Sequence, residues 1–436
     1  MRRSQVTALL LLLGAERNVA QGAEAHPEPA AVTMQSTAST TPQSEGWSEE
    51  EAVLRALKEN PGLRAFRKQR AVAEAQIVSA SAIENPSLQF QLVHVQTGTQ
   101  MGFATTLKWA PPQPVVWSAS RSLARAHVEQ VRFEIAEQEW LIATQVRLAH
   151  TTLLLLKEQR RLYDQLLSLR RRLVELVKTR VGHGSSTRIE LNQVQLSTLY
   201  AQRDLDELSL RQTESQSQLH SLLGILSATP LSVRGSIPTG LELSTLADPD
   251  ALAEQALLAR PALKAAQTRI VQREQAVRVE KAKRWPWFEL SGRYRHTTSV
   301  NYPNEGLVGI EIPLPILNLN SGPIQVTSAE LDLELALAQA AFQNLKQSVY
   351  AAYAEVSARR SIVLRYHRDV LPVIAEHEQL MELALKDGQI DLVTLLSSEE
   401  SALRGQREFN EARLALRRAW LALEAAVGTP LTEVPR

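Results

Sequence analysis

Cysteine is absent from this sequence of 436 residues. Its absence excludes disulfides, thiolate metal sites, cysteine nucleophiles and a lipid attached at an N-terminal cysteine. Aromatic residues are also few, at 5% of the chain against 44% for all hydrophobic residues. This balance favours helices packed through Ala, Leu and Val over a β-rich core. The 48 basic and 47 acidic residues nearly cancel, and no block of like charge stands out, so the composition does not indicate nucleic-acid binding.

Long hydrophobic runs are lacking as well. The N-terminal run Val6–Leu13 follows two arginines and is far too short to cross a bilayer as a helix. Together with the A-x-A pattern at Ala23–Ala25, it predicts a secretory signal peptide over residues 1–25. Residues 26–46 are rich in Pro, Ser, Thr and Ala and are predicted to be a disordered leader. No other stretch could form a transmembrane helix, so any membrane insertion would have to use strands.

The signatures of common enzyme classes are missing too. There is no G-x-S-x-G nucleophile elbow, no phosphate-binding loop with its lysine and no G-x-G-x-x-G fingerprint. The nine histidines form no H-x-x-x-H or H-E-x-x-H set, and a lone histidine such as His183 is usually only a solvated side chain. We therefore expect no catalytic residues, no bound metal and no cofactor, and we expect that the protein is not an enzyme.

Self-similarity at a fixed offset is the most informative positive feature. Four pairs of landmarks recur in the same order, at an offset of 200 in the first two pairs and 204 in the last two. They are Asn60-Pro61 with Arg260-Pro261, Asn85-Pro86 with Trp285-Pro286, Gly184 with Gly388, and Gly224 with Gly428. The sequence therefore predicts two structural repeats, over residues 47–230 and 248–431, joined by an equatorial linker at 231–247 and followed by a tail at 432–436.

Each repeat is predicted to follow the same order of elements. A first helix of about 35 residues begins at a cap, Ser48 or Asp248, and ends near the second proline landmark. Two strands follow, then a very long helix, a glycine turn and a last helix that ends at a glycine cap. The predicted ranges are 118–181 and 324–386 for the long helices, and 187–223 and 391–427 for the last helices.

The long helix of the first repeat carries an apolar stripe at spacings of three and four, as in a coiled coil. The stripe consists of Val131, Ile135, Ile142, Val146, Leu153, Leu156, Leu166, Leu169, Leu173 and Leu176. At 1.5 Å per residue such a helix spans about 95 Å, close to the length of two of the shorter helices stacked end to end. We therefore expect duplicated helical hairpins in a cylinder about 100 Å tall, with the linker and the tail at a joint near its middle.

The predicted strands alternate between apolar and polar residues, which is typical of strands with one face in lipid and the other in water. The expected lipid face consists of Phe90, Phe103, Leu107, Trp109, Phe288, Leu290, Tyr294 and Ile310. The alternative is an ordinary amphipathic sheet packed against helices. In lipid, the few predicted strands would leave open edges with unpaired backbone groups. A barrel would therefore have to be shared between subunits.

The duplicated order of elements resembles that of the TolC-type outer-membrane efflux proteins over roughly residues 47–431. The matching segments are Ala56–Pro61, Ala256–Pro261, Ile312–Asn318 and Gly388–Leu396. The resemblance implies a mainly α fold with a small transmembrane β part, in which a homotrimer forms an α-barrel tunnel and a shared twelve-stranded β-barrel. It also implies contact with outer-membrane lipid, with the tunnel in the periplasm of a bacterium. The implied partners are a periplasmic adaptor protein and an inner-membrane efflux pump.

Within this family, the segment Pro313–Asn318 most resembles the heavy-metal branch, whose systems export divalent cations such as cobalt, zinc and cadmium. The expected function is therefore a passive exit duct for divalent heavy-metal cations that a pump and an adaptor deliver. Two alternatives remain open. One is a channel for drugs or solvents, and the other is a periplasmic coiled-coil scaffold without a pore.

The two glycine turns are expected to form the periplasmic tip and the docking surface for the adaptor. These positions are Val181, Gly182, His183, Gly184, Ser185, Lys386, Asp387, Gly388 and Gln389. Acidic side chains near a closing tip would favour cations. The candidate aperture residues are Glu190, Asp387, Asp391, Thr394 and Ser397. The family usually has acids where this sequence has Thr394 and Ser397, and a basic residue where it has Ile390. Alternatively, Asp391 only caps a helix and Asp387 is a solvated turn residue.

Overall fold

The computed structural model describes residues 46–95, 100–226, 231–237, 247–297, 304–386 and 392–431. The predicted signal peptide, nearly all of the predicted leader and the C-terminal tail lie outside the described residues. So do the predicted tip residues Asp387, Gly388 and Gln389 and the candidate aperture residue Asp391. Residues Glu45–Arg436 form one compact unit, and all of the described helices and strands belong to it.

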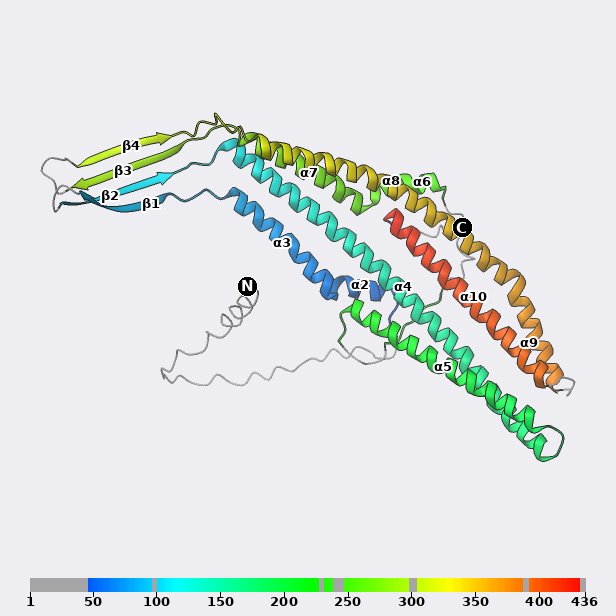
Figure 1. The fold of residues 1–436 in the computed structure, drawn as a ribbon. Helices are drawn as coiled ribbons and strands as arrows, with labels where there is room; N and C mark the ends of the chain where they lie inside the picture. Colours follow the sequence, from blue (N-terminus) through cyan, green and yellow to red (C-terminus); the bar gives the residue numbers. More distant parts are fainter. Residues whose placement is uncertain are drawn as a thin grey trace, which may run out of the picture. The chain divides into compact units, whose positions relative to one another are not determined.

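The same order of elements occurs twice along the chain (Figure 1). The first set is α2 (Glu49–Glu59), α3 (Pro61–Ser81), β1 (Ser87–Val95), β2 (Gln100–Trp109), α4 (Pro114–Gly182) and α5 (Arg188–Leu223). The second set is α6 (Pro249–Ala259), α7 (Pro261–Ala282), β3 (Glu289–Thr297), β4 (Glu305–Glu311), α8 (Ser321–Arg365), the π-helical segment η1 (Tyr366–Val370), α9 (Leu371–Lys386) and α10 (Leu392–Val427). None of the described helices is both long and apolar enough to cross a membrane.

The first helix of each repeat is broken, so the prediction of one helix of about 35 residues was wrong. The break falls at Asn60 and at Arg260, each of which precedes a proline and adopts an extended ψ near 120°. A residue before proline is pushed away from the helical region by the proline ring. Asn60 also ends α2 and begins α3, because its side-chain oxygen accepts the Leu63 N–H at 2.9 Å. The landmark Asn60-Pro61 is therefore a helix joint.

The long helices differ between the repeats. The first, α4, is continuous over 69 residues. The second, predicted as a long helical stretch over 324–386, is helical over Ser321–Lys386 but contains the π-helical segment η1 between α8 and α9. Pro372 lies just after this segment. Proline has no backbone N–H, so it cannot donate to the carbonyl four residues earlier as an α-helix requires. The predicted stripe of α4 is buried at Val131, Val146 and Leu153 but fails near its end, where Leu176 is exposed and Val177 is buried instead.

Helix α4 is central to the packing: it lies along α3, α5, α7 and α10, while α8 lies along α7 and α10 (Figure 1). One core cluster joins α2, α4 and α5 and includes Val233 and Ile237 from the linker. The linker residue Val233 also pairs with Trp47 in an isolated parallel bridge. The described part of the linker is therefore packed against the helices at the point where α2 meets α5.

Candidate channel-forming sheet and helical tip

The four strands form one antiparallel sheet in the order β1-β2-β3-β4, so sequence neighbours are also neighbours in space. The two repeats are joined between β2 and β3, where Leu107 lies opposite Gly292. Strands β1 and β4 each have a single partner strand among the described residues. Their outer edges thus carry backbone N–H and C=O groups without a strand to bind them.

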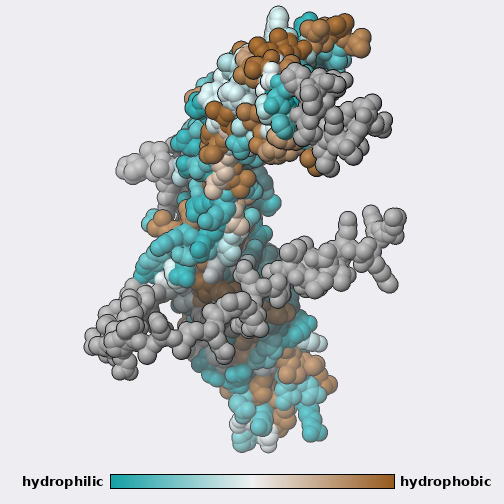
Figure 2. Space-filling view, turned by 90° about the vertical axis from the view of Figure 1, so that its left-hand side faces the viewer, coloured by the Kyte–Doolittle hydropathy of each residue, from teal (hydrophilic) through white to brown (hydrophobic). Residues whose placement is uncertain are grey.

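One face of this sheet is apolar and exposed, as predicted. Among the predicted lipid-face residues, those on the strands are exposed: Phe90, Phe103, Leu107, Trp109, Leu290, Tyr294 and Ile310. The register places them in adjacent rows, for example Trp109 opposite Leu290 and Leu290 opposite Ile310. Figure 2, which views the molecule from the sheet side, shows hydrophobic side chains gathered in the upper part of the view. No described helix packs over this face, because none of the substantial contacts between described elements joins a helix to a strand.

Phe288, the remaining predicted lipid-face residue, lies just before the strand, so its place on this face stays a prediction. Strand β3 begins one residue later, at Glu289, and Phe288 is half-buried with its ring 4.8 Å from that of Trp287. If the register continued, Phe288 would lie opposite Pro111 on the β2 side. On the β4 side it would lie opposite Ile312, which is followed by Pro313. Proline cannot donate to a strand ladder, so pairing stops at this level on both sides.

The opposite face of the sheet carries a network of ion pairs across strands. Lys108 on β2 lies 3.1 Å from a carboxylate oxygen of Glu289 on β3 and 3.7 Å from one of Glu311 on β4. The other polar contacts on this face are Arg293 Nη2 to Gln91 Oε1 at 3.2 Å and Arg295 Nη1 to Glu305 Oε2 at 3.6 Å. The charges balance, so this face is strongly polar without favouring one sign of solute.

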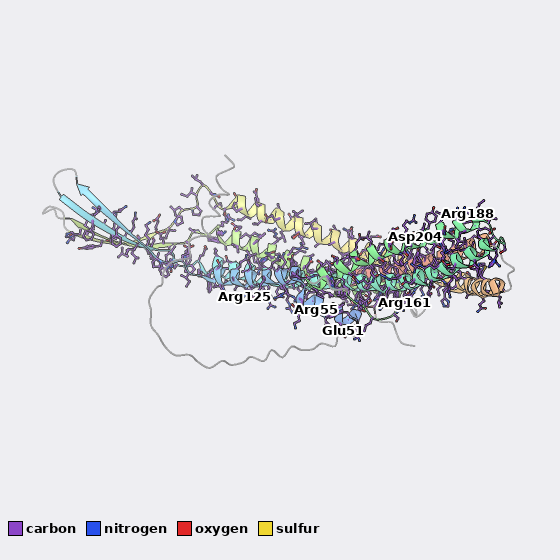
Figure 3. The ribbon with its side chains drawn as sticks, turned by 90° about the horizontal axis from the view of Figure 1, so that it is seen from below. Glu51, Arg55, Arg125, Arg161, Arg188 and Asp204 are labelled. Atoms are coloured by element: carbon purple, nitrogen blue, oxygen red, sulfur yellow. The ribbon has the colours of Figure 1, made fainter. Side chains whose placement is uncertain are left out.

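The turn between α4 and α5 is tight and open to solvent. Gly184 has φ +71°, in the left-handed region that favours glycine, and the Ser185 N–H donates to the Arg180 carbonyl at 2.9 Å. Of the predicted tip residues here, Gly182, His183, Gly184 and Ser185 are exposed and Val181 is half-buried. Figure 3 places Arg188, the first residue of α5, at the end of the helices farthest from the sheet. The described turn is thus available to a partner.

The candidate aperture residues are only partly described. Glu190 accepts the Thr187 N–H at 3.0 Å while Thr187 caps the Glu190 N–H, so its carboxylate belongs to a capping box. Thr394 and Ser397 are exposed on the first turns of α10, and the Ser397 hydroxyl donates to the Thr394 carbonyl. Their role at an aperture stays a prediction.

Sequence reasoning missed a buried charge near this end. Arg170 on α4 is buried and donates to the Ser197 carbonyl on α5. Its guanidinium also lies 3.8 Å from Glu399 and 3.9 Å from Glu400 on α10. Burial raises the pKa of Glu399, and the nearby Arg170 lowers it by less. The available signal was an arginine at stripe spacing, four residues after Leu166.

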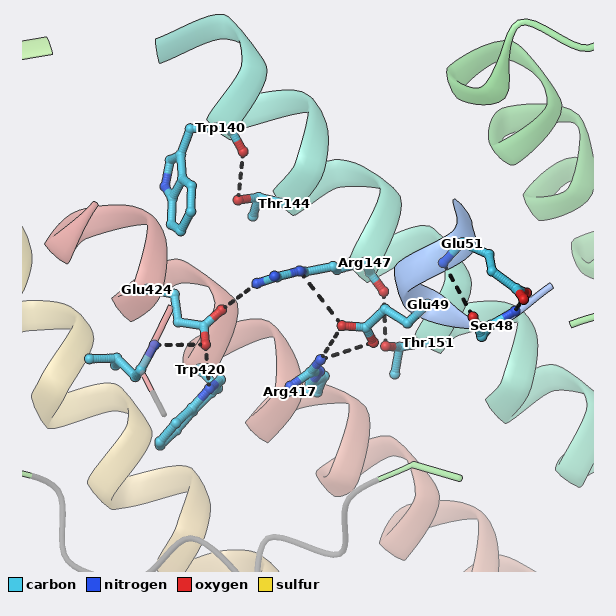
Figure 4. A network of polar contacts seen from close by, with 11 residues as sticks. Ser48, Glu49, Glu51, Trp140, Thr144, Arg147, Thr151, Arg417, Trp420 and Glu424 are labelled. Atoms are coloured by element: carbon cyan, nitrogen blue, oxygen red, sulfur yellow. Dashed lines mark hydrogen bonds and ion pairs between the residues drawn. The ribbon is translucent and has the colours of Figure 1, made fainter. Parts of the chain in front are cut away.

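A second missed network joins the repeats further from the tip (Figure 4). Arg147 on α4 donates to Glu424 on α10 at 3.0 Å and lies 3.7 Å from Glu49 on α2. Arg417 on α10 donates to both oxygens of Glu49, at 2.8 and 3.0 Å. Two bases and two acids from three helices are thus brought together, although Arg147 and Glu424 lie 277 residues apart and Glu49 and Arg417 lie 368 apart. No periodicity in the sequence could have paired them.

Glu424 is the buried member of this network. Besides Arg147, it accepts the Trp420 indole N–H and the Leu431 backbone N–H, each at 3.1 Å. Burial raises the pKa of Glu424, while Arg147 and these hydrogen bonds lower it by less. Glu424 therefore ties the last described residue to the helices. Within the described residues, no group of three or more His, Asp or Glu could hold a metal ion.

The family model for outer membrane efflux proteins matches residues 52–225 and 252–429, one match in each repeat. The chain belongs to the outer membrane efflux protein family. It is therefore an outer-membrane efflux channel protein, with its helical part in the periplasm, and not an enzyme. The predicted resemblance is confirmed.

Individual relatives of this efflux protein are distant in sequence and close in fold. It is 21% identical to the cobalt-zinc-cadmium resistance protein CzcC of Cupriavidus metallidurans over 362 residues, which is 82% of this chain and 84% of that protein. A crystal structure of CusC matches with a TM-score of 0.71 at 16% identity, covering 87% of this chain and 92% of that one. A membrane protein from Pseudomonas aeruginosa matches with a TM-score of 0.72 at 16% identity, covering 93% and 99%. These structural likenesses show the fold.

Proposed function

We propose that three copies of this efflux protein assemble into one channel, in which β4 of each copy pairs with β1 of the next. The observation that carries this proposal is the four-stranded sheet with two free edges and an exposed apolar face. A sheet with open edges is not tolerated in lipid, because each unpaired backbone group costs several kcal/mol there. Pairing the edges among three copies gives a closed barrel of about twelve strands with the apolar face outward.

The polar face then lines the bore, and the helical part continues the duct into the periplasm. The channel is passive, and a periplasmic adaptor and an inner-membrane pump supply the solute and the energy. The turn Val181–Ser185, exposed apart from the half-buried Val181, belongs to the adaptor-docking tip. The matching turn at 387–390, together with Asp391, Thr394 and Ser397, completes the tip in this proposal.

The proposed solutes are divalent heavy-metal cations. The support is the match to a cobalt-zinc-cadmium resistance protein over most of both chains. The sheet itself adds no preference for cations, because its acids and bases balance. We therefore assign the choice of solute to the pump rather than to this protein. A strain that lacks this protein should lose tolerance to cobalt, zinc and cadmium while its tolerance to organic drugs is unchanged. The reverse pattern would assign the protein to drug efflux.

The chain's lack of cysteine allows a clean test of the assembly. Gln89→Cys on β1 is combined in turn with Glu305→Cys, Leu307→Cys and Gly309→Cys on β4, all on the polar face. Opposed residues of antiparallel strands lie about 5 Å apart, within reach of a disulfide. Oxidation of outer-membrane fractions should give covalent dimers and trimers with at least one combination, and the purified protein should conduct ions in planar bilayers. Single-cysteine variants are the control. A non-conducting monomer that never cross-links would overturn the proposal.

A further inference from the structure

The apolar face of β4 continues past the end of the strand. Val308 and Ile310 lie on the strand, and Ile312, Leu314 and Ile316 continue the same alternation into the loop before α8, all between 53% and 91% exposed. Leu317 and Leu319 in the same loop are exposed too. An apolar surface of this extent normally has a partner, since exposing it to water is unfavourable. We name residues Ile312–Leu319 the junction loop.

The junction loop is held in a defined position. Asn320, the residue after it, adopts a left-handed conformation with φ 59°, and its N–H donates to the Asn318 side chain at 2.9 Å. Its side-chain amide donates to both the backbone carbonyl and the carboxylate of Glu280, at 2.8 and 2.9 Å. Glu280 is in the last turn of α7, so Asn320 fixes the loop against the end of that helix.

Basic and aromatic side chains lie at this same helix end. Lys281, Lys283, Arg284 and Trp285 are all exposed. Lys283 pairs with Glu280 at 2.6 Å. Within the described part of the chain, Lys281 and Arg284 have no ion-pair partner. Two cations without an ion pair to any described residue, and an exposed indole, thus lie beside an exposed apolar loop.

The first repeat shows that the fold does not need an exposed apolar loop beside a basic helix end. At the offset of 200, Lys281, Lys283 and Arg284 correspond to Ser81, Ile83 and Glu84. The connection from β2 to α4 consists of residues 110–113 only, whereas the connection from β4 to α8 is longer and consists of residues 312–320. Helix α3 ends without a basic last turn, so the bases of the second repeat are not explained by the need to cap a helix.

We propose that the junction loop and these bases bind anionic phospholipid in the periplasmic leaflet of the outer membrane. The proposal rests on the proposed function in one respect, that the apolar sheet face lies in lipid. Strands in the membrane and helices in the periplasm put the junction at the boundary of that leaflet. Leucine and isoleucine side chains then contact acyl chains, Trp285 lies at the interface, and Lys281 and Arg284 reach the phosphates.

The test uses the assembled full-length protein in detergent, with phosphatidylglycerol and phosphatidylcholine as probes. Lipid adducts are counted by native mass spectrometry. The wild type should retain phosphatidylglycerol about tenfold better than phosphatidylcholine, and K281Q/R284Q should reduce this preference to about twofold or less. The matched control, R161Q/R172Q, removes two exposed bases from α4 and should keep the wild-type preference. High salt should weaken the preference in the wild type.

A second variant pair separates lipid from the alternative occupant, a neighbouring copy of the chain. L314S/L317S should lower retention of both lipids while the oligomer and its conductance persist. If L314S/L317S instead dissociates the oligomer, the loop is a subunit contact and the lipid proposal is wrong. It is equally wrong if K281Q/R284Q keeps the full preference in a conducting oligomer. A wild type that is monomeric and does not conduct would contradict the proposed function, which is a different result.

Discussion

The two repeats bury equivalent positions but differ where their elements end. Ala56 and Ala256 are both fully buried, as are Leu219 and Leu423. By contrast, α4 is continuous where the second repeat has η1, and the connection before α8 is longer than the one before α4, which is only residues 110–113. Duplication thus preserved the packing that makes a helical hairpin. Differences accumulated at turns and junctions, where a changed side chain does not leave a cavity.

The close approach at the end of α5 gives the largest expected difference between the repeats. Gly224→Ala would place a Cβ 2.6 Å from the Glu59 carbonyl oxygen at φ +67°. We expect a loss of about 3–4 kcal/mol in the free energy of unfolding, from the left-handed backbone and the clash together. Gly428→Ala, whose nearest atom is 3.0 Å away, should cost less. Thermal unfolding followed by circular dichroism measures both, and Gly182→Ala, with nothing within 4 Å, is the control. Equal losses at 224 and 428 would contradict this account.

The network around Glu424 gives a smaller effect, and the first repeat has no carboxylate at the position equivalent to Glu424. Glu424→Ala would leave Arg147 without this carboxylate and the Trp420 and Leu431 N–H groups without an acceptor. We expect a loss of about 2–3 kcal/mol, below the value for a fully buried pair because Arg147 is partly exposed. His220 is the equivalent residue at the offset of 204, and His220→Ala should change stability by about 0.5 kcal/mol or less. Chemical denaturation distinguishes the two. If the two variants lose equal stability, the network adds nothing.

The smallest expected effect is on the pH dependence of the free energy of unfolding. Burial raises the folded-state pKa of Glu399, so the folded protein binds a proton more tightly there than the unfolded chain does. Glu399 therefore contributes fully to stability when the pH is below the ordinary glutamate pKa of the unfolded chain. This contribution is lost as the pH rises through the raised pKa of the folded protein. Glu399→Gln, which copies Gln195 of the first repeat, should flatten the stability profile in that window. Unfolding between pH 4 and pH 7 measures this, and Glu214→Gln, at an exposed position on α5 away from Arg170, is the control. An unchanged profile in Glu399→Gln would refute the assignment.

Local signals in the sequence predicted most of the element order but not every boundary. Gly224 was predicted to cap α5, and its φ of +67° confirms this. The break at Asn60 and the π-helical segment before Pro372 were missed, although the prolines were visible, because a proline can either begin a helix or interrupt one. The stripe on α4 was wrong at Leu176 because a strict spacing drifts around a long helix.

By itself, the sequence determined what is local: the duplication, the helix caps and the alternation that puts Phe103 and Leu107 on one strand face. Backbone geometry and side-chain period decide these features within a few residues. Only the tertiary structure decided which distant groups meet, such as Arg147 with Glu424 and Asn320 with Glu280. The reason is that periodicity reveals which face of a helix is buried, but the packing of many side chains sets how far one helix slides along the next.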